Sequence, residues 1–170
     1  MTVSELNEPK EWAKQGDWGS HLPLLHLAIT NTDGTVFELG SGLISTPLLR
    51  QFCRENNRLF FSYDSNKEWC KKTYSIEIKN WDEQKDLWLP TFPCGLVFID
   101  EAPGEHRKES IELFKNIADC IVIHDTEVGA DYVYKMADVL SKFKYRIDYE
   151  VDAYPRTTLV SNKIDVTKWI

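Results

Sequence analysis

The stretch that decides the fold is Val36-Phe37-Glu38-Leu39-Gly40-Ser41-Gly42, an apolar run with one acid that ends in a glycine turn. The apolar residues predict a short buried strand. The glycines predict a tight turn where backbone can approach a ligand closely, because glycine has no Cβ. A second apolar run, residues 60–63, ends in Asp64. An acid at the tip of a neighbouring strand can accept hydrogen bonds from a ribose diol, so the two runs together predict a nucleotide-type cofactor.

Each half of this signal has a plainer interpretation. One alternative is that Gly40 and Gly42 merely make a tight strand-to-helix turn and contact no ligand. Another is that Asp64 merely caps the helix that follows it. The cofactor interpretation therefore depends on the rest of the chain.

Length, composition and charge narrow the class of protein. The chain has 170 residues, 42% of them hydrophobic and 12% aromatic, as expected for one globular domain over residues 1–170. The net charge of −7 disfavours nucleic acid as the main partner, because phosphate binding needs a basic surface. The apolar runs are too short to span a bilayer, and residues 1–10 lack the apolar core of a signal peptide. We therefore expect a cytoplasmic protein that does not bind membranes.

The cysteines give no sign of a metal or disulfide framework. No two of them have CxxC spacing, and each lies in or beside an apolar segment; they are Cys53, Cys70, Cys94 and Cys120. We expect free, buried thiols.

Strand and helix patterns alternate along the chain. Strands are predicted at residues 36–39, 58–63, 74–78, 95–99, 120–123, 143–151 and 157–161, and helices at residues 20–29, 45–56, 67–72, 105–118 and 131–142. Ser20 is the expected cap of the first helix, with Pro23 in its first turn. The alternation predicts a single-domain α/β fold. Its doubly wound, mostly parallel seven-stranded sheet has helices on both faces and ends in an antiparallel hairpin.

Polar residues follow several of the predicted strands. They are Asp64, Asp82, Asp100, His124 and Asp125. Ligands of open α/β sheets bind beyond the carboxyl ends of the strands, so we expect these side chains to meet at one edge.

With these elements in place, the chain resembles the class I S-adenosylmethionine-dependent methyltransferases over residues 22–162. Glu38 to Gly42 is similar to the first motif of that family, and Leu96-Val97-Phe98-Ile99-Asp100 to its fourth-strand motif. A third glycine is missing, because Ser41-Gly42 continues into Leu43-Ile44-Ser45. The closing hairpin also matches the family.

The resemblance implies S-adenosylmethionine as the cofactor and assigns residues to its parts. Backbone at Gly40, Ser41 and Gly42 would face the methionine moiety and the ribose. Glu38 would anchor the turn or the cofactor ammonium, and Asp64 would accept from the ribose hydroxyls. Trp81 and Asp82 would border the adenine. Asp100 would lie near the methionine end and the acceptor.

Methyl transfer also requires that the acceptor be aligned and, where needed, deprotonated. The candidate catalytic residues are His124 with Asp125, His106 and Asp100. His106 and Arg107 can either grip a polar or anionic substrate or lie on a solvated helix face. Acids after these strands bind a divalent cation in some related small-molecule enzymes. Here a histidine takes the place of an oxygen ligand, so we expect no metal.

Residues 1–19 form a polar leader. Its end, Gly16-Asp17-Trp18-Gly19-Ser20-His21, can act as a lid over the cofactor, with glycine hinges and Trp18 excluding water.

Three functions remain open on the sequence. The leading one is methyl transfer to an oxygen or nitrogen atom of a small molecule. The second is a non-catalytic protein that binds the cofactor or a partner. The third is a NAD(P)-dependent oxidoreductase, since Gly40-x-Gly42-x-x-Ser45 nearly matches the dinucleotide fingerprint. Glu38, two residues before the first glycine, favours methyl transfer. The hairpin edge can also pair between subunits and give a homo-oligomer.

Overall fold

The computed structural model describes residues 19–80, 93–150 and 155–170. Trp81, Asp82 and the predicted lid residues before Gly19 lie outside the described residues.

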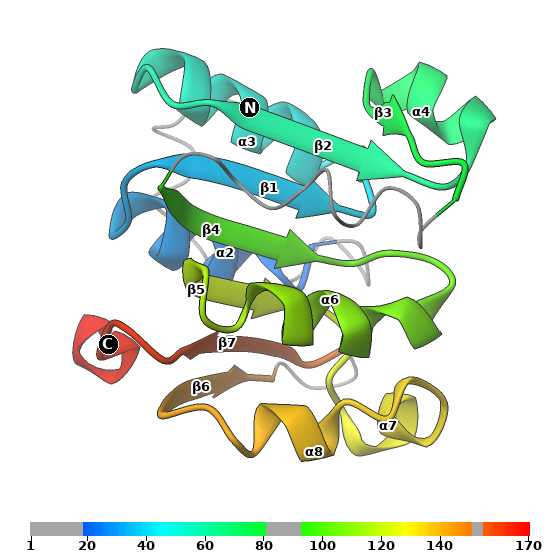
Figure 1. The fold of residues 1–170 in the computed structure, drawn as a ribbon. Coiled ribbons are helices and arrows are strands. Elements are labelled where there is room, and N and C mark those ends of the chain that lie inside the picture. Colours follow the sequence, from blue (N-terminus) through cyan, green and yellow to red (C-terminus); the bar gives the residue numbers. More distant parts are fainter. Residues whose placement is uncertain (1–18, 81–92, 151–154) are drawn as a thin grey trace.

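A 7-stranded sheet organises the chain, in the order β3-β2-β1-β4-β5-β7-β6 (Figure 1). The strands are β1 (Thr35–Leu39), β2 (Phe60–Asp64), β3 (Ile76–Glu77), β4 (Cys94–Ile99), β5 (Ala118–Ile123), β6 (Tyr145–Tyr149) and β7 (Thr157–Ser161). The first five strands, β1 to β5, all pair in parallel, with β3 at one edge of the sheet, whereas β7 pairs antiparallel with both β5 and β6. The predicted mostly parallel sheet with an antiparallel C-terminal hairpin is confirmed.

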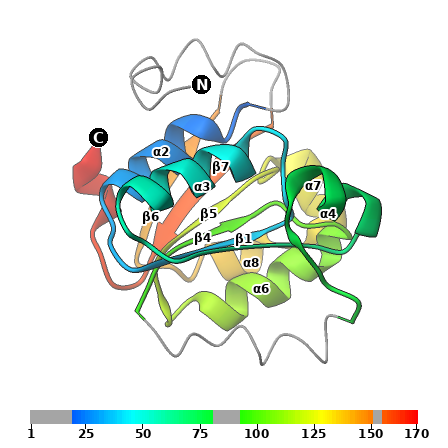
Figure 2. The ribbon, with the colours of Figure 1, turned by 90° about the horizontal axis from the view of Figure 1, so that it is seen from above.

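Helices cover both faces of the sheet, as predicted. They are α2 (Leu22–Thr30), α3 (Ser45–Glu55), α4 (Lys67–Thr73), α6 (Arg107–Phe114), α7 (Val128–Tyr134) and α8 (Ala137–Leu140), with 3-10 turns η3 (Gly104–His106) and η4 (Val166–Trp169). Figure 2 shows α2 and α3 on one face, and α6 and α8 on the other.

The central strands are buried on both sides, which explains their continuous apolar sequence. Successive side chains of β4 point to opposite faces. Leu96 and Phe98 join the core under α2 and α3, and Val97 and Ile99 join the core under α6 and α8. The two cores hold the carboxyl ends of β1, β4 and β5 side by side.

Three predicted helices differ in the structure. His21 occupies the N-cap position of α2 in place of Ser20, whose hydroxyl instead bonds to His124. The helix predicted at 105–118 begins with the turn η3 and continues as α6. It ends earlier than predicted, because Ala118 already belongs to β5. The helix predicted at 131–142 is divided into α7 and α8 at Lys135, which has a left-handed φ of 52°.

The cysteine prediction is confirmed, since all four thiols are free and buried. Among the described residues, we find no helix with the length and apolar character needed to cross a membrane.

Candidate functional site

The glycine turn, residues 40–42, packs so closely against the neighbouring strands that Gly40 has no room for a side chain. Gly40 has a φ of 88°, which is unfavourable for other residues. A Cβ on Gly40 would overlap the backbone carbonyl of Asp100, and the Gly40 amide donates to the carbonyl of Tyr63 at 2.9 Å. The turn therefore lies against the ends of both β2 and β4.

Glu38 anchors this turn from below. Its side chain is fully buried, and Oε2 accepts from the hydroxyls of Thr46 at 2.7 Å and Ser62 at 2.5 Å. The Thr46 hydroxyl in turn accepts from the amide of Gly42 at 2.9 Å. Burial raises the pKa of Glu38 to about 7, against the opposing effect of hydrogen bonds from Ser45, Ser62 and Thr46. Glu38 thus lies beneath the turn as a structural anchor, the first of its two predicted roles.

Asp64 fixes the other side of the turn. Its Oδ2 accepts from the amide of Ser41 at 3.0 Å and from the Ser41 hydroxyl at 3.2 Å. Its Oδ1 accepts from the amide of Asn66, and Asn66, not Asp64, caps α4. Trp69 donates from its indole to the Ser41 carbonyl at 2.5 Å. The ribose role of Asp64 stays a prediction.

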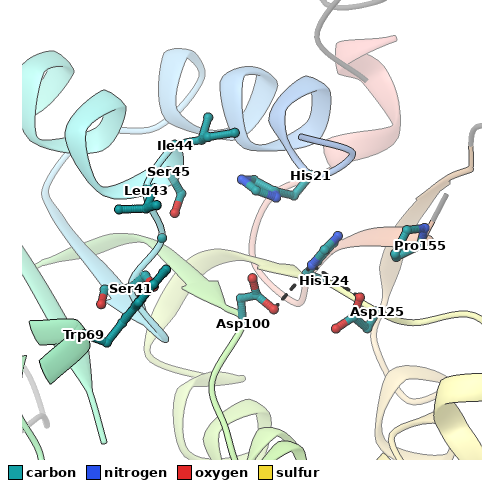
Figure 3. A pocket seen from close by; sticks show the side chains of 11 residues that line it. His21, Ser41, Leu43, Ile44, Ser45, Trp69, Asp100, His124, Asp125 and Pro155 are labelled. Carbon is teal, nitrogen blue, oxygen red and sulfur yellow. Dashed lines mark hydrogen bonds and ion pairs between the residues drawn. The ribbon is translucent and has the colours of Figure 1, made fainter. Parts of the chain in front are cut away.

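A cavity of about 230 Å³ opens between the glycine turn and the ends of β4 and β5 (Figure 3). We call it the β4–β5 cavity. Its lining residues are His21, Ser41, Gly42, Leu43, Ile44, Ser45, Trp69, Asp100, His124, Asp125 and Pro155. It therefore combines an apolar wall with a cluster of titratable groups.

A second cavity, of about 110 Å³, lies at the end of β2. This β2 cavity is lined by Gly40, Tyr63, Asp64, Ser65, Ile78, Lys79, Glu101, Ala102 and His106. The structure thus divides the predicted residues between two cavities. The β4–β5 cavity is lined by Ser41, Gly42, Asp100, His124 and Asp125. The β2 cavity is lined by Gly40, Asp64 and His106. His106 is not brought together with His124.

Arg107 joins the carboxylates of the β4–β5 cavity. Its guanidinium donates from Nη2 to Asp100 and from Nη1 to Asp125, both at 3.0 Å. It also donates to the backbone carbonyls of Glu101 and His124, and it lies over the ring of Tyr134. Arg107 is only 5% exposed, so neither the substrate-gripping role nor the solvated helix face expected from the sequence is correct.

His124 lies between the two acids. Its Nδ1 is 3.3 Å from Asp100 and 3.4 Å from Asp125. Burial lowers the pKa of His124, but the hydrogen bond and charge of Asp100, together with the charge of Asp125, outweigh it, and the net shift is upward. Burial raises the pKa of Asp100, yet His124 and Arg107 outweigh it and the net shift is downward. The cluster therefore stabilises the charge of Asp100 and makes His124 more basic than a free imidazole.

Ser20 completes a hydroxyl–imidazole–carboxylate chain, with its Oγ 2.8 Å from Nε2 of His124. This order of groups also occurs in Ser–His–Asp hydrolases. Ser20 is only 1% exposed and is not among the residues that line the cavity. We therefore interpret the Ser20 hydroxyl as a group that orients His124, not as a nucleophile.

Three potential metal ligands lie within 4.8 Å of one another: a ring nitrogen of His124 and one carboxylate oxygen each of Asp100 and Asp125. This spacing could hold a cation. Arg107 already binds both carboxylates and would repel that cation. The expectation of no metal here stays a prediction.

Three features of the site have no clear signal in the sequence. The polar neighbours of Arg107 hide its burial. His21 is expected on an apolar helix or in the lid, not in the cavity, and no motif marks Trp69. Burial of these side chains depends on packing between distant elements, which local sequence patterns do not report.

No family model matches the chain, and no curated protein is similar in sequence. Solved structures are similar in fold. A Corynebacterium glutamicum protein superposes with a TM-score of 0.59 at 9% identity, covering 96% of this chain and 91% of that one. The MTase domain of METTL16 gives 0.52 at 11% identity, covering 95% and 68%. A human methyltransferase 10 domain containing protein gives 0.53 at 10% identity, covering 96% and 99%.

The chain has the class I methyltransferase fold. The strand order with β7 antiparallel between β5 and β6 agrees with this and differs from the six parallel strands of a dinucleotide-binding sheet. At identities this low the likeness establishes the architecture alone.

Proposed function

We propose that the protein transfers a methyl group from S-adenosylmethionine to an oxygen or nitrogen atom of a small molecule. The observation that carries this proposal is the position of one loop between two cavities. Gly40 borders the β2 cavity beside Asp64, while Ser41 and Gly42 border the β4–β5 cavity beside Asp100. A ligand laid across this loop would have its ribose at one cavity and its reactive end at the other.

The residues present fit this cofactor. Asp64 is anchored by Ser41 and Asn66, yet it still lines the β2 cavity, where a diol could reach it. The indole of Trp69 holds the Ser41 carbonyl in place. The Thr46 hydroxyl, itself bound to Glu38, holds the Gly42 amide. When bound, S-adenosylmethionine supplies an electrophilic methyl on a sulfonium. The chain's task is to orient that methyl toward the acceptor and to accept a proton.

His124 is the residue that we assign to take up the acceptor proton. It lines the cavity, and Asp100 and Asp125 beside its Nδ1 would stabilise the imidazolium that forms. Ser20 currently bonds to Nε2, so it must release that nitrogen before His124 can accept a proton there. Arg107 holds the two carboxylates in place and limits their repulsion.

The alternatives make different predictions. A nicotinamide oxidoreductase is disfavoured by the strand order, and a non-catalytic binding protein would bind the cofactor without turnover. We expect isothermal titration to show binding of S-adenosylmethionine and of its demethylated product, and no binding of NAD or NADP. Failure to bind either sulfur compound would remove the proposal.

A matched pair of variants tests the ribose contact. Asp64→Asn should weaken cofactor binding by about tenfold, because it removes the negative charge facing the diol. One of the two oxygens that accept from the Ser41 and Asn66 amides becomes a donor, so thermal unfolding must first show that the variant stays folded. Asp138→Asn, on the exposed surface of α8 and outside both cavities, should bind like the wild type. Equal affinities for all three proteins would show that the cofactor lies elsewhere.

A further inference from the structure

His21 stands out in the β4–β5 cavity because its ring has no hydrogen-bond partner. It caps the start of α2, it is only 4% exposed, and it lines the cavity. Neither Nδ1 nor Nε2 forms a hydrogen bond with any described part of the chain. Buried polar atoms are nearly always satisfied, and a buried exception calls for a ligand or an ordered water.

The surroundings hold the ring in a fixed orientation. Its centroid lies 4.9 Å from that of Phe98 and 5.1 Å from that of His124, with a near-perpendicular approach to the latter. Figure 3 shows His21 on the same side of the cavity as His124, with Ser41 and Trp69 on the other side. A ligand in this cavity would therefore meet both imidazoles.

His21 offers a neutral imidazole. Burial and the neighbouring His124 lower its pKa to about 3, and the charge of Asp100 opposes them only in part. A neutral imidazole has one N–H donor and one nitrogen acceptor. A hydroxyl can accept from the N–H of His21 and still present its own proton to His124, so it suits this pair of imidazoles.

The other lining groups argue against an anionic ligand. Asp100 and Asp125 would repel an anion, and no lysine or arginine is among the described lining residues. Arg107 pairs with both acids, so it offsets their attraction for a cation and is not free to bind an anion. The remaining wall is largely apolar, formed by Leu43, Ile44, Trp69 and Pro155. An uncharged ligand with an apolar body and a hydroxyl group fits these features best.

We propose that His21 is a specificity-determining residue that binds the hydroxyl group of an uncharged alcohol or phenol serving as the methyl acceptor. This inference rests on the proposed methyl transfer and adds the chemical class of the acceptor. It assigns to α2 a role separate from that of His124: His21 orients the hydroxyl, whereas His124 takes up its proton.

The test uses three small probes of similar size on the full chain saturated with the demethylated cofactor. Phenol carries the hydroxyl, toluene lacks it, and benzoate is an anion. Ligand-detected NMR titration should show that the wild type binds phenol about tenfold more tightly than toluene or benzoate. Equal binding of phenol and toluene, or tighter binding of benzoate, would overturn the inference.

Variants separate the role of the ring nitrogens from that of packing. His21→Phe keeps an aromatic ring against Phe98 but should lose the preference for phenol, whereas His21→Asn keeps a donor and an acceptor and should retain part of it. His26→Phe is the control, because His26 lies on the same helix, half-buried and outside the cavity. A phenol preference that survives in His21→Phe would refute the assignment.

Two further measurements, of cofactor binding and of nitrogen-15 shifts, separate a failure of the proposed function from a failure of the His21 assignment. If the wild type fails to bind S-adenosylmethionine, the proposed function fails; if it binds the cofactor but does not distinguish phenol from toluene, only the role of His21 fails. If His21→Phe does not fold, nitrogen-15 shifts of His21 in the wild type decide. They should move when phenol is added and not when toluene is added, and an unchanged His21 signal with phenol would contradict the inference.

Discussion

The hydroxyl of Ser20 lies 2.8 Å from Nε2 of His124, although 104 residues separate the two in the chain. This bond ties the segment before α2 to the carboxyl end of β5. Both residues are buried, so the bond is shielded from water and fixes the orientation of the imidazole that faces the cavity. The β4–β5 cavity is therefore assembled from chain segments that only the completed fold brings together.

Removing this bond should cost stability without removing chemistry. Ser20→Ala leaves Nε2 of His124 without its hydroxyl partner, and we expect a loss of about 1–2 kcal/mol in the free energy of unfolding. Urea denaturation measures this. The control is Ser141→Ala, whose exposed hydroxyl bonds only to the carbonyl of Asp138 and should change stability very little. If Ser20→Ala also abolished methyl transfer, Ser20 would be a proton carrier and not an orienting group.

The glycine turn should be intolerant of a single methyl group. In Gly40→Ala the new Cβ would meet the Asp100 carbonyl, at a φ of 88°, so we expect a loss of several kcal/mol or a failure to fold. Gly129→Ala is the matched control in α7, where a Cβ would have nothing within 4 Å. That variant should be stabilised by up to about 1 kcal/mol, because alanine favours helix. Thermal unfolding of both proteins gives the comparison, and similar melting temperatures would contradict it.

Arg107 should contribute more to stability than any exposed ion pair. Arg107→Met leaves Asp100 and Asp125 without their shared cation in a largely buried site, and we expect a loss of about 3–5 kcal/mol. Arg146→Met removes a pair with Asp148 on the exposed side of β6 and should cost about 0–1 kcal/mol. Chemical denaturation at neutral pH measures both. A small effect at Arg107 would mean that water or another group compensates the two acids.

Glu38 should make stability depend on pH. Its pKa is 4.5 in the unfolded chain and about 7 in the fold, so between these values the folded state holds a proton that the unfolded state has released. The stability that Glu38 contributes is therefore complete below pH 4.5, falls as pH rises through 7, and is lower by about 3 kcal/mol above it.

Glu38→Gln removes this titration. We expect the variant to match the wild type near pH 4.5 and to be more stable than it at pH 8, measured by urea unfolding at each pH. Glu55→Gln, on the exposed side of α3, serves as the control and should follow the wild type at every pH. A constant difference between Glu38→Gln and wild type across this range would show that Glu38 keeps its charge in the fold.

Much of the architecture could be read from the sequence. The apolar run before Gly40 and the continuous apolar run of β4 mark buried strands, and the spacing between them leaves room for crossover helices. Helix limits were less accurate. The end of α6 was placed too late because Ile117 and Ala118 continue an apolar pattern that a helix and a strand share. The break between α7 and α8 depends on the left-handed backbone of Lys135, for which no local motif was recognised.

The candidate site was predicted only in part. Asp100, His124 and Asp125 were expected together and do meet, because parallel strands bring their carboxyl ends to one edge. His106 was expected beside them but lines the β2 cavity, since η3 turns the chain before α6 begins.

By itself, the sequence determined which segments form the central strands and which polar residues follow them, because burial patterns and glycine turns are local properties. Only the tertiary structure decided that Arg107 is buried between two acids, that Ser20 bonds to His124, and that the His21 ring nitrogens have no hydrogen-bond partner among the described residues. These relationships arise from packing α2 and α6 on opposite faces of the sheet. The energy of each such contact depends on neighbours that are far away in the chain.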